Sequence, residues 1–185
     1  MATTGFGITA HMVSSLDGMI AKPDNSVSWF ESSSPYEKGV SGQDAEEFLK
    51  TIDCYIMGSR TYEHAVELSK SYGWAYGDKP TIVLTSRPLT ADRDNIEFYS
   101  GDLFQLVTDK LKPRYRNVWV VGGASLVKAF LQRGLVDEIR LSILPVILGD
   151  GLLFFDHIGR ELPLQLKDSV AYKNGMVELH YGIAK

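Results

Sequence analysis

The sequence has very little cysteine. Cys54 is the only one among 185 residues, so no disulfide can form within the chain, and we expect a reducing compartment. Its neighbours in the chain are apolar, which favours a buried structural thiol. The sequence does not open with a basic segment followed by an apolar one, so we expect no secretory signal and a cytoplasmic location.

Long hydrophobic runs are also missing. The most apolar run, residues 141–148, is too short to cross a bilayer and contains Pro145. The net charge is -4 and no basic stripe is visible, which argues against nucleic acid as a partner. With 44% hydrophobic and 23% charged residues, the composition is that of a globular protein, and we expect one domain over residues 1–185.

Several familiar site motifs are absent. The chain contains no Gly-x-Gly-x-x-Gly fingerprint, no Walker A loop and no Gly-x-Ser-x-Gly elbow, which disfavours a Rossmann domain, a P-loop enzyme and a serine hydrolase. The histidines show no metal-ligand spacing, so we expect no metal site and interpret all four as structural or surface residues. They are His11, His64, His157 and His180.

Hydrophobic periodicity predicts alternating strands and helices. The predicted strands are 6–13, 54–57, 81–84, 96–99, 118–121 and 138–144, and the predicted helices are 43–51, a short one from Thr61, 102–113 and one after Gly123. Asn174-Gly175 then separates extended segments at 164–172 and 176–183, which predicts an antiparallel hairpin. The pattern indicates an α/β fold of three layers, with a mixed, mostly parallel sheet flanked by helices.

Three predicted strands end in residues that suit an anion. One stops on Gly122-Gly123 before a helix, and the other two are followed by the runs Gly58-Ser59-Arg60-Thr61 and Thr85-Ser86-Arg87. The carboxyl ends of parallel strands share one sheet edge, so these corners should converge. Helix N-termini and Arg side chains bind phosphates, so the pattern suits a dinucleotide and favours NADP over NAD.

Two carboxylates are candidates for a proton relay. Asp17 follows the carboxyl end of the first strand, and Asp44 borders the apolar face of a predicted helix, whereas Glu47 lies nearly opposite that face. A half-buried carboxyl group has a raised pKa, which a proton donor near neutral pH requires, so Asp44 is the better candidate. The alternatives are a simple turn at Asp17-Gly18 and a helix-dipole role for Asp44 and Glu47.

Four segments together resemble the dihydrofolate reductase fold family, and most closely its branch around the reductase domain of riboflavin biosynthesis. They are Ser15-Leu-Asp-Gly-Met-Ile-Ala21, Ile56-Met-Gly-Ser-Arg-Thr-Tyr-Glu63, Ile82-Val-Leu-Thr-Ser-Arg87 and Val120-Val-Gly-Gly-Ala-Ser-Leu126. The segments 136–141 and 145–151 fit that branch too, and the resemblance covers nearly the whole chain in the family's order.

The resemblance implies NADPH bound along the carboxyl edge of the sheet. Residues 58–61 and 85–87 would hold the adenosine phosphates, residues 122–126 would hold the pyrophosphate, commonly with a cis bond between the glycines, and Ala10 and Ile20 would flank the nicotinamide. The implied cofactor-binding residues are Ala10, Ile20, Gly58, Ser59, Arg60, Thr61, Thr85, Ser86, Arg87, Gly122, Gly123, Ala124, Ser125 and Leu126.

The substrate side of the resemblance is less complete. Asp44 and Phe48 match the spacing of the acid and the Phe that meet the pterin, and Trp29 resembles the Trp that ends the mobile first loop. Asp78 stands in the region where folate enzymes carry an Arg that clamps the substrate's carboxylate, and an Asp would repel that group. We therefore expect an NADPH-dependent reductase of another small heterocycle, pteridine- or pyrimidine-like.

Other functions remain open at this point. A non-catalytic or regulatory nucleotide-binding protein could keep the fold without turnover, and a binder of flavin or another phosphate ligand would show no preference for NADPH. A homodimer could form across a sheet edge through the C-terminal hairpin.

Overall fold

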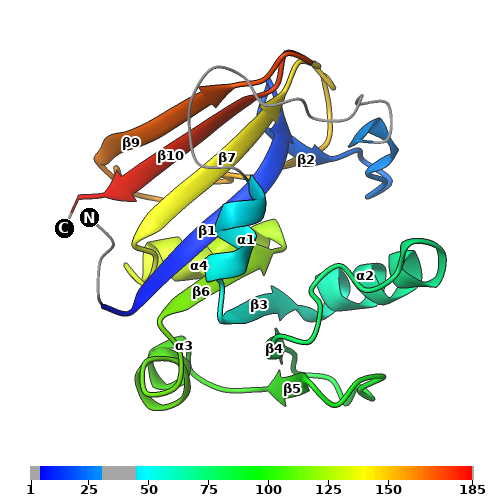
Figure 1. Cartoon of the computed structure of the whole chain (residues 1–185), viewed down its shortest axis with the longest axis vertical. Coiled ribbons are helices and arrows are strands. Elements are labelled where there is room, and N and C mark those ends of the chain that lie inside the picture. Colours follow the sequence, from blue (N-terminus) through cyan, green and yellow to red (C-terminus); the bar gives the residue numbers. More distant parts are fainter. Residues whose placement is uncertain (1–4, 31–44, 185) are drawn as a thin grey trace.

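The chain forms an eight-stranded sheet with the order β5-β4-β3-β6-β1-β7-β10-β9 (Figure 1). The computed structural model describes residues 5–30 and 45–184. All pairs from β5 through β7 are parallel, and β10 runs antiparallel to both of its neighbours. The predicted α/β class, with a mostly parallel sheet and a C-terminal antiparallel hairpin, is confirmed.

The strands of the main sheet agree closely with the predicted ones. They are β1 (Gly7–Ser15), β3 (Cys54–Gly58), β4 (Thr81–Leu84), β5 (Ile96–Tyr99), β6 (Asn117–Gly122), β7 (Glu138–Leu144), β9 (Leu164–Ala171) and β10 (Val177–Ile183). A separate pair, β2 (Met19–Ala21) and β8 (Leu152–Leu153), was not predicted. Gly175, with φ of +87°, makes the predicted turn between β9 and β10.

The helical segments lie on both faces of the sheet. They are η1 (Ser28–Phe30), α1 (Ala45–Thr51), α2 (Ser59–Tyr72), α3 (Leu103–Gln105), η2 (Leu106–Leu111) and α4 (Ala124–Gln132). The prediction of a short helix from Thr61 was wrong, because α2 begins directly after β3 and runs for 14 residues. Asp102 caps α3 by accepting from the amides of Phe104 and Gln105, and η2 continues it as a π-helical turn.

Alternation along the strands gives the sheet two apolar faces. The buried side chains of β3 illustrate this, since Cys54 and Ile56 pack with α4 and η2, whereas Tyr55 and Met57 pack with α1 and α2. Figure 1 shows α1 in front of β1 and β6, with α4 behind them. Cys54 is fully buried, which confirms the predicted buried thiol, and burial raises the pKa of this thiol to about 12.

Candidate functional site

The carboxyl ends of β3 and β6 meet at one edge of the sheet. A Cβ atom added to Gly58 would lie 3.8 Å from the carbonyl oxygen of Gly122 and 3.9 Å from the nitrogen of Gly123. One added to Gly123 would lie 3.5 Å from Oγ1 of Thr61. Two of the predicted corners are therefore in contact, and glycine keeps the space between them open.

The third corner joins them through Arg87. Its Nη2 atom lies 3.5 Å from Oγ of Ser59 and donates to Oε2 of Glu63 at 2.9 Å. Thr85 fixes the corner, because its hydroxyl accepts from the backbone N–H of Arg87 at 3.0 Å. The exposed side chains at the three corners include Arg60, Ser86, Arg87 and Ser125. The convergence predicted from parallel topology is thus present in the structure.

Two helices begin at this edge without a side-chain cap in the described part of the chain. Gly58 is the N-cap of α2 and Gly123 is the N-cap of α4, and neither position can supply a capping side chain. The side chains of Ala124 and Leu126 pack against the core, so only their backbone can face a ligand. Uncapped N-termini present N–H groups and a positive dipole end, which suit an anion.

The sheet opens between β1 and β6 next to this edge. The two strands pair only as far as Ala10 and Val120, whereas β1 stays paired with β7 up to Ser15 and Leu144. Strand β6 instead pairs Gly122 with β3 after a register shift. Gly122 has φ of +134°, a conformation that favours glycine, and the peptide bond from Gly122 to Gly123 is cis, as the resemblance implies.

The two residues predicted to flank a nicotinamide lie in the core. Ala10 has no exposed surface and Ile20 is 7% exposed, and both belong to the cluster that packs on α4. Met12 lies closer to the carboxyl end of β1. Its Cε atom is 3.0 Å from a Cβ atom added to Gly122, so Met12 borders the gap. A ligand in the gap would meet Met12 before Ala10, because Ala10 lies two residues deeper along β1.

Asp17 ties two loops together. Its carboxylate accepts from Oγ of Ser15 at 2.5 Å and from the amides of Leu148 at 3.1 Å and Gly149 at 2.8 Å. These hydrogen bonds, that of Ser15 first, lower its pKa to about 2. The carboxylate is therefore ionised at neutral pH, which makes it a poor proton donor. The role of Asp17 as a proton relay stays a prediction.

Of the other predicted residues, Asp44 lies outside the described residues. Phe48 is buried on α1 and contacts the sheet beside the gap. Trp29 is also buried, but it belongs to a different apolar cluster, with Leu144 and Met176. The structure therefore does not bring Trp29 and Phe48 together in one cluster.

A cluster of polar side chains, which the sequence interpretation missed, lies on the α1 face of β1, β7 and β10. We call it the polar cluster, and its members are His11, Arg140, Ser142, Glu178 and His180. His11 Nε2 lies 3.3 Å from Oγ of Ser142, and Nη1 of Arg140 donates to Oε1 of Glu178 at 3.1 Å. The sequence analysis interpreted His11 as a structural or surface residue and did not predict its polar neighbours on β7 and β10. Polar residues at alternate strand positions were the available signal.

Burial changes the protonation of this cluster. It lowers the pKa of His11 to about 3, with further contributions from the nearby Arg140 and His180, so the ring is neutral. Burial also raises the pKa of Glu178. Beside the cluster, the hydrogen bond from His180 to Glu138 at 2.7 Å helps to lower the pKa of Glu138 to about 2.

Comparison with known proteins identifies the family. The model of the RibD C-terminal domain matches residues 64–178 of this chain. The chain belongs to the RibD C-terminal domain family. The uncharacterized protein YwjB of Bacillus subtilis (strain 168) is 32% identical over 167 residues, which cover 90% of this chain and 92% of YwjB.

Solved structures show the same RibD-like, dihydrofolate reductase-type fold. A protein from Shewanella sp. PV-4 assigned to riboflavin biosynthesis aligns with a TM-score of 0.83 at 20% identity, covering 97% of this chain and all of that one. The diaminohydroxyphosphoribosylaminopyrimidine deaminase/5-amino-6-(5-phosphoribosylamino)uracil reductase of Thermotoga maritima aligns with a TM-score of 0.65 at 14% identity. That alignment covers 97% of this chain and 57% of the Thermotoga chain.

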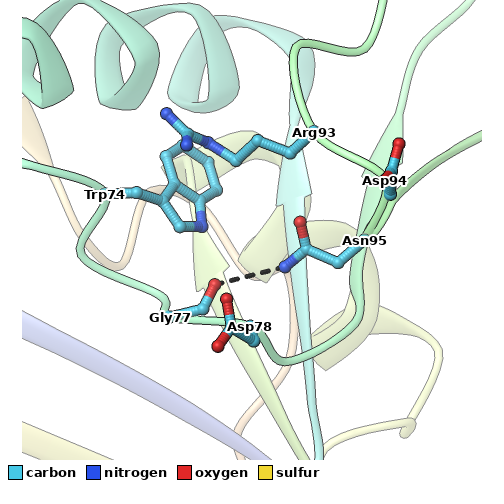
Figure 2. A pocket seen from close by; sticks show the side chains of 6 residues that line it. All are labelled: Trp74, Gly77, Asp78, Arg93, Asp94 and Asn95. Atoms are coloured by element: carbon cyan, nitrogen blue, oxygen red, sulfur yellow. Dashed lines mark hydrogen bonds between the residues drawn. The ribbon is translucent and has the colours of Figure 1, made fainter.

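This RibD-type chain also carries a cavity of about 470 Å³ at the amino edge of β4 and β5. The lining residues are Trp74, Gly77, Asp78, Arg93, Asp94 and Asn95 (Figure 2). The Arg93 guanidinium lies 4.8 Å from the centre of the Trp74 ring, and the Asn95 amide donates to the carbonyl of Gly77. Two carboxylates, Asp78 and Asp94, and the guanidinium of Arg93 border this cavity, and the repulsion of a substrate carboxylate by Asp78 stays a prediction.

Residues 5–30 and 45–184 contain neither a metal-binding cluster nor a membrane-spanning helix. No group of three or more His, Cys, Asp or Glu side chains in that part is placed to hold a metal ion. No helix there is both long and apolar enough to pass through a lipid bilayer.

Proposed function

We propose that this protein is an NADPH-dependent reductase of a small, pyrimidine-like heterocycle. The RibD C-terminal domain family supports the reductase class, and the Thermotoga neighbour is named as a uracil-type reductase.

One observation carries the cofactor assignment, namely the meeting of two uncapped helix N-termini with Arg87 at one sheet edge. Gly58 and Gly123 leave a space that a Cβ atom on either would begin to fill. Backbone N–H groups and helix dipoles from both sides suit a pyrophosphate. Arg87, which already reaches Ser59, and the exposed Arg60 would favour the extra phosphate of NADPH over NADH.

The gap between β1 and β6 is the place where a flat ring could approach the substrate side of the sheet. When bound there, NADPH would supply the hydride. The protein would position both rings, with Met12 and Gly122 bordering the gap. On the strength of the sequence pattern, Asp44 would deliver the accompanying proton.

The test combines binding with turnover. NADPH and NADH dissociation constants are measured by calorimetry, and NADPH absorbance is followed with pyrimidine and pteridine substrates. We expect tighter binding of NADPH and oxidation with a pyrimidine-type compound. Asp44→Asn should slow hydride transfer at neutral pH and leave NADPH affinity nearly unchanged.

The possible failures point to different conclusions. No affinity for either nicotinamide nucleotide at millimolar concentration would overturn the proposal. Tight NADPH binding without oxidation across the substrate panel would instead favour the non-catalytic nucleotide-binding alternative. Equal activity of Asp44→Asn across the pH range would remove Asp44 as the relay.

A further inference from the structure

The polar cluster is built by register across three strands. His11 on β1 lies beside Arg140 on β7, which lies beside His180 on β10, and Ser142 lies beside Glu178 one step further along. Residues paired in register point to the same face of a sheet, so all five side chains share the α1 face. Apolar and aromatic side chains of β3, β4 and β6 line the same face beside the cluster, and the polar Thr9 and Glu138 adjoin it along β1 and β7.

The fold alone gives little reason to bury these charges. The side chains of Arg140 and Glu178 are 7% and 5% exposed, and they form an ion pair of 3.1 Å. Removing such a pair from water costs several kcal/mol per ion, and apolar residues of similar volume usually serve stability equally well or better. A function that uses both charges would explain why they occupy a position suited to apolar residues.

Aromatic rings frame the cluster on the side of the gap. The Arg140 guanidinium lies 4.3 Å from the centre of the Phe48 ring, and the His11 ring lies 4.9 Å from Trp119 and 5.4 Å from Phe48. His11 directly precedes Met12, which borders the gap between β1 and β6. Successive side chains of a strand point to opposite faces, so the cluster lies beside the gap on the face that α1 covers, whereas the Met12 side chain packs on the α4 face.

The cluster offers hydrogen-bonding groups of both kinds and little net charge. The Arg140 guanidinium donates, the Glu178 carboxylate accepts, and the two charges cancel. His11 is neutral, and its enclosed Nδ1 atom has no hydrogen-bond partner among the residues that the structure describes. His11 is a partly exposed residue, whereas Arg140 and Glu178 are buried, so His11 is the most accessible of the three.

We propose that His11, Arg140 and Glu178 recognise the substrate, and that they select an uncharged planar heterocycle with a hydrogen-bond donor beside an acceptor. A uracil ring has such an edge, in which a ring N–H lies between two carbonyl groups. A carbonyl oxygen would accept from Arg140, and the ring N–H would donate to Glu178 or His11. This assignment rests on the proposed reductase function and names the substrate-recognising end of the same site.

The first experiment measures ligand choice on the full chain. Binding of uracil and of 1,3-dimethyluracil, which has no N–H donor, is followed by saturation-transfer NMR with and without NADPH. We expect uracil to bind and its dimethyl derivative to bind at least about tenfold more weakly, the loss typical of an unpaired buried group. Equal binding of the two compounds, or no binding of uracil, would overturn the proposal.

Variants separate recognition from folding. Arg140→Met removes the donor proposed for a ring carbonyl, and Glu178→Gln replaces the carboxylate proposed to accept from the ring N–H with a neutral amide. Each should weaken uracil binding at least about tenfold. Arg93→Met is the matched control, because Arg93 also stacks on an aromatic ring and pairs with Asp92 at 3.3 Å, but lies at the amino-edge cavity. Unchanged uracil affinity in the first two variants would contradict the proposal.

A double variant distinguishes substrate recognition from a purely structural role of the Arg140–Glu178 ion pair. Arg140→Met combined with Glu178→Leu should keep or raise the melting temperature, as apolar replacements of buried ion pairs usually do, and should abolish uracil binding. A sharp fall in melting temperature would assign the pair to stability instead. NADPH affinity, measured on every variant, should stay at the wild-type value, whereas failure of the proposed cofactor would appear already in the wild-type protein.

Discussion

Among single residues, Arg87 has the contacts that bear most directly on cofactor choice. Its ion pair with Glu63 joins side chains that are 54% and 45% exposed, so the pair adds little stability, about 0–1 kcal/mol. Arg87→Ala should reduce NADPH affinity at least about tenfold, because a charge-assisted hydrogen bond contributes about 1.5–3 kcal/mol. NADH affinity should change little, and calorimetry with both nucleotides checks this.

Glu63→Gln is the companion variant of Arg87→Ala. It removes the competing carboxylate and should strengthen NADPH binding. A loss of affinity for NADPH and NADH in equal measure after Arg87→Ala would show that Arg87 does not read the extra phosphate.

His11 should make stability depend on pH in a defined direction. Its pKa is about 3 in the folded protein and about 6.5 in the unfolded chain, so the unfolded chain binds the proton first as the pH falls. The contribution of His11 to stability is complete above pH 6.5 and decreases below it, by about 1.4 kcal/mol per pH unit. The free energy of unfolding of His11→Phe, measured in urea between pH 7 and about 5, should fall less steeply than that of the wild type.

The surrounding groups determine how that measurement is read. His11 faces Arg140 and Ser142 on β7, and Glu178 and His180 on β10. The raised pKa of Glu178 acts with the opposite sign, so the difference between variant and wild type is compared. His64→Phe, on the exposed surface of α2, is the control and should keep the wild-type slope. An identical slope in His11→Phe would contradict a buried, neutral His11.

At the scale of secondary structure, the N-termini of α2 and α4 are expected to act as one anion site. Gly58 has φ of -78°, which any residue adopts, and an added Cβ atom would make ordinary contacts at 3.8 and 3.9 Å. Gly58→Ala should therefore fold normally, yet weaken NADPH binding at least about tenfold, because the methyl group occupies the space between the two N-termini.

Gly7→Ala is the matched control for that substitution. It adds the same methyl group at the amino end of β1, where the only neighbouring atom is 3.9 Å away, and it should leave NADPH affinity unchanged. Equal NADPH affinity in Gly58→Ala and Gly7→Ala would rule out this position as the phosphate site. Melting temperatures of both variants show whether they fold like the wild type.

The elements that were predicted correctly carry local signals. Alternating apolar residues gave most main-sheet strands to within two residues, and the glycine and arginine corners followed from short motifs plus parallel topology. Strands β2 and β8 are only three and two residues long, too short for any periodicity. The polar cluster left only a weak local signal, the polar residues at alternate strand positions, because it depends on the register of β1, β7 and β10, which pairs residues as far apart as His11 and Arg140.

At the scale of the whole molecule, β9 is a candidate for self-association. It is an edge strand of the main sheet, and Leu164 and Leu166 on it are 44% and 54% exposed. Exposed apolar side chains on an edge strand favour pairing with another chain. We expect a dimer in solution, and Leu166→Lys should shift it to the monomer in size-exclusion chromatography with light scattering.

Leu152→Lys on β8 serves as the control for the dimer, because Leu152 is exposed to a similar degree, 42%, but lies outside the main sheet. It should leave the elution volume unchanged. A wild-type protein that is monomeric at all concentrations would contradict self-association through β9.

The order of the strands separates two tasks on either side of β1. The proposed cofactor corners lie at the ends of β3, β4 and β6, whereas Arg140, Ser142, Glu178 and His180 lie on β7 and β10. Selection can therefore alter the second group without disturbing the first. Relatives that keep the glycine corners should differ at positions 140 and 178 wherever they reduce a different substrate, while the proposed hydride donor stays the same.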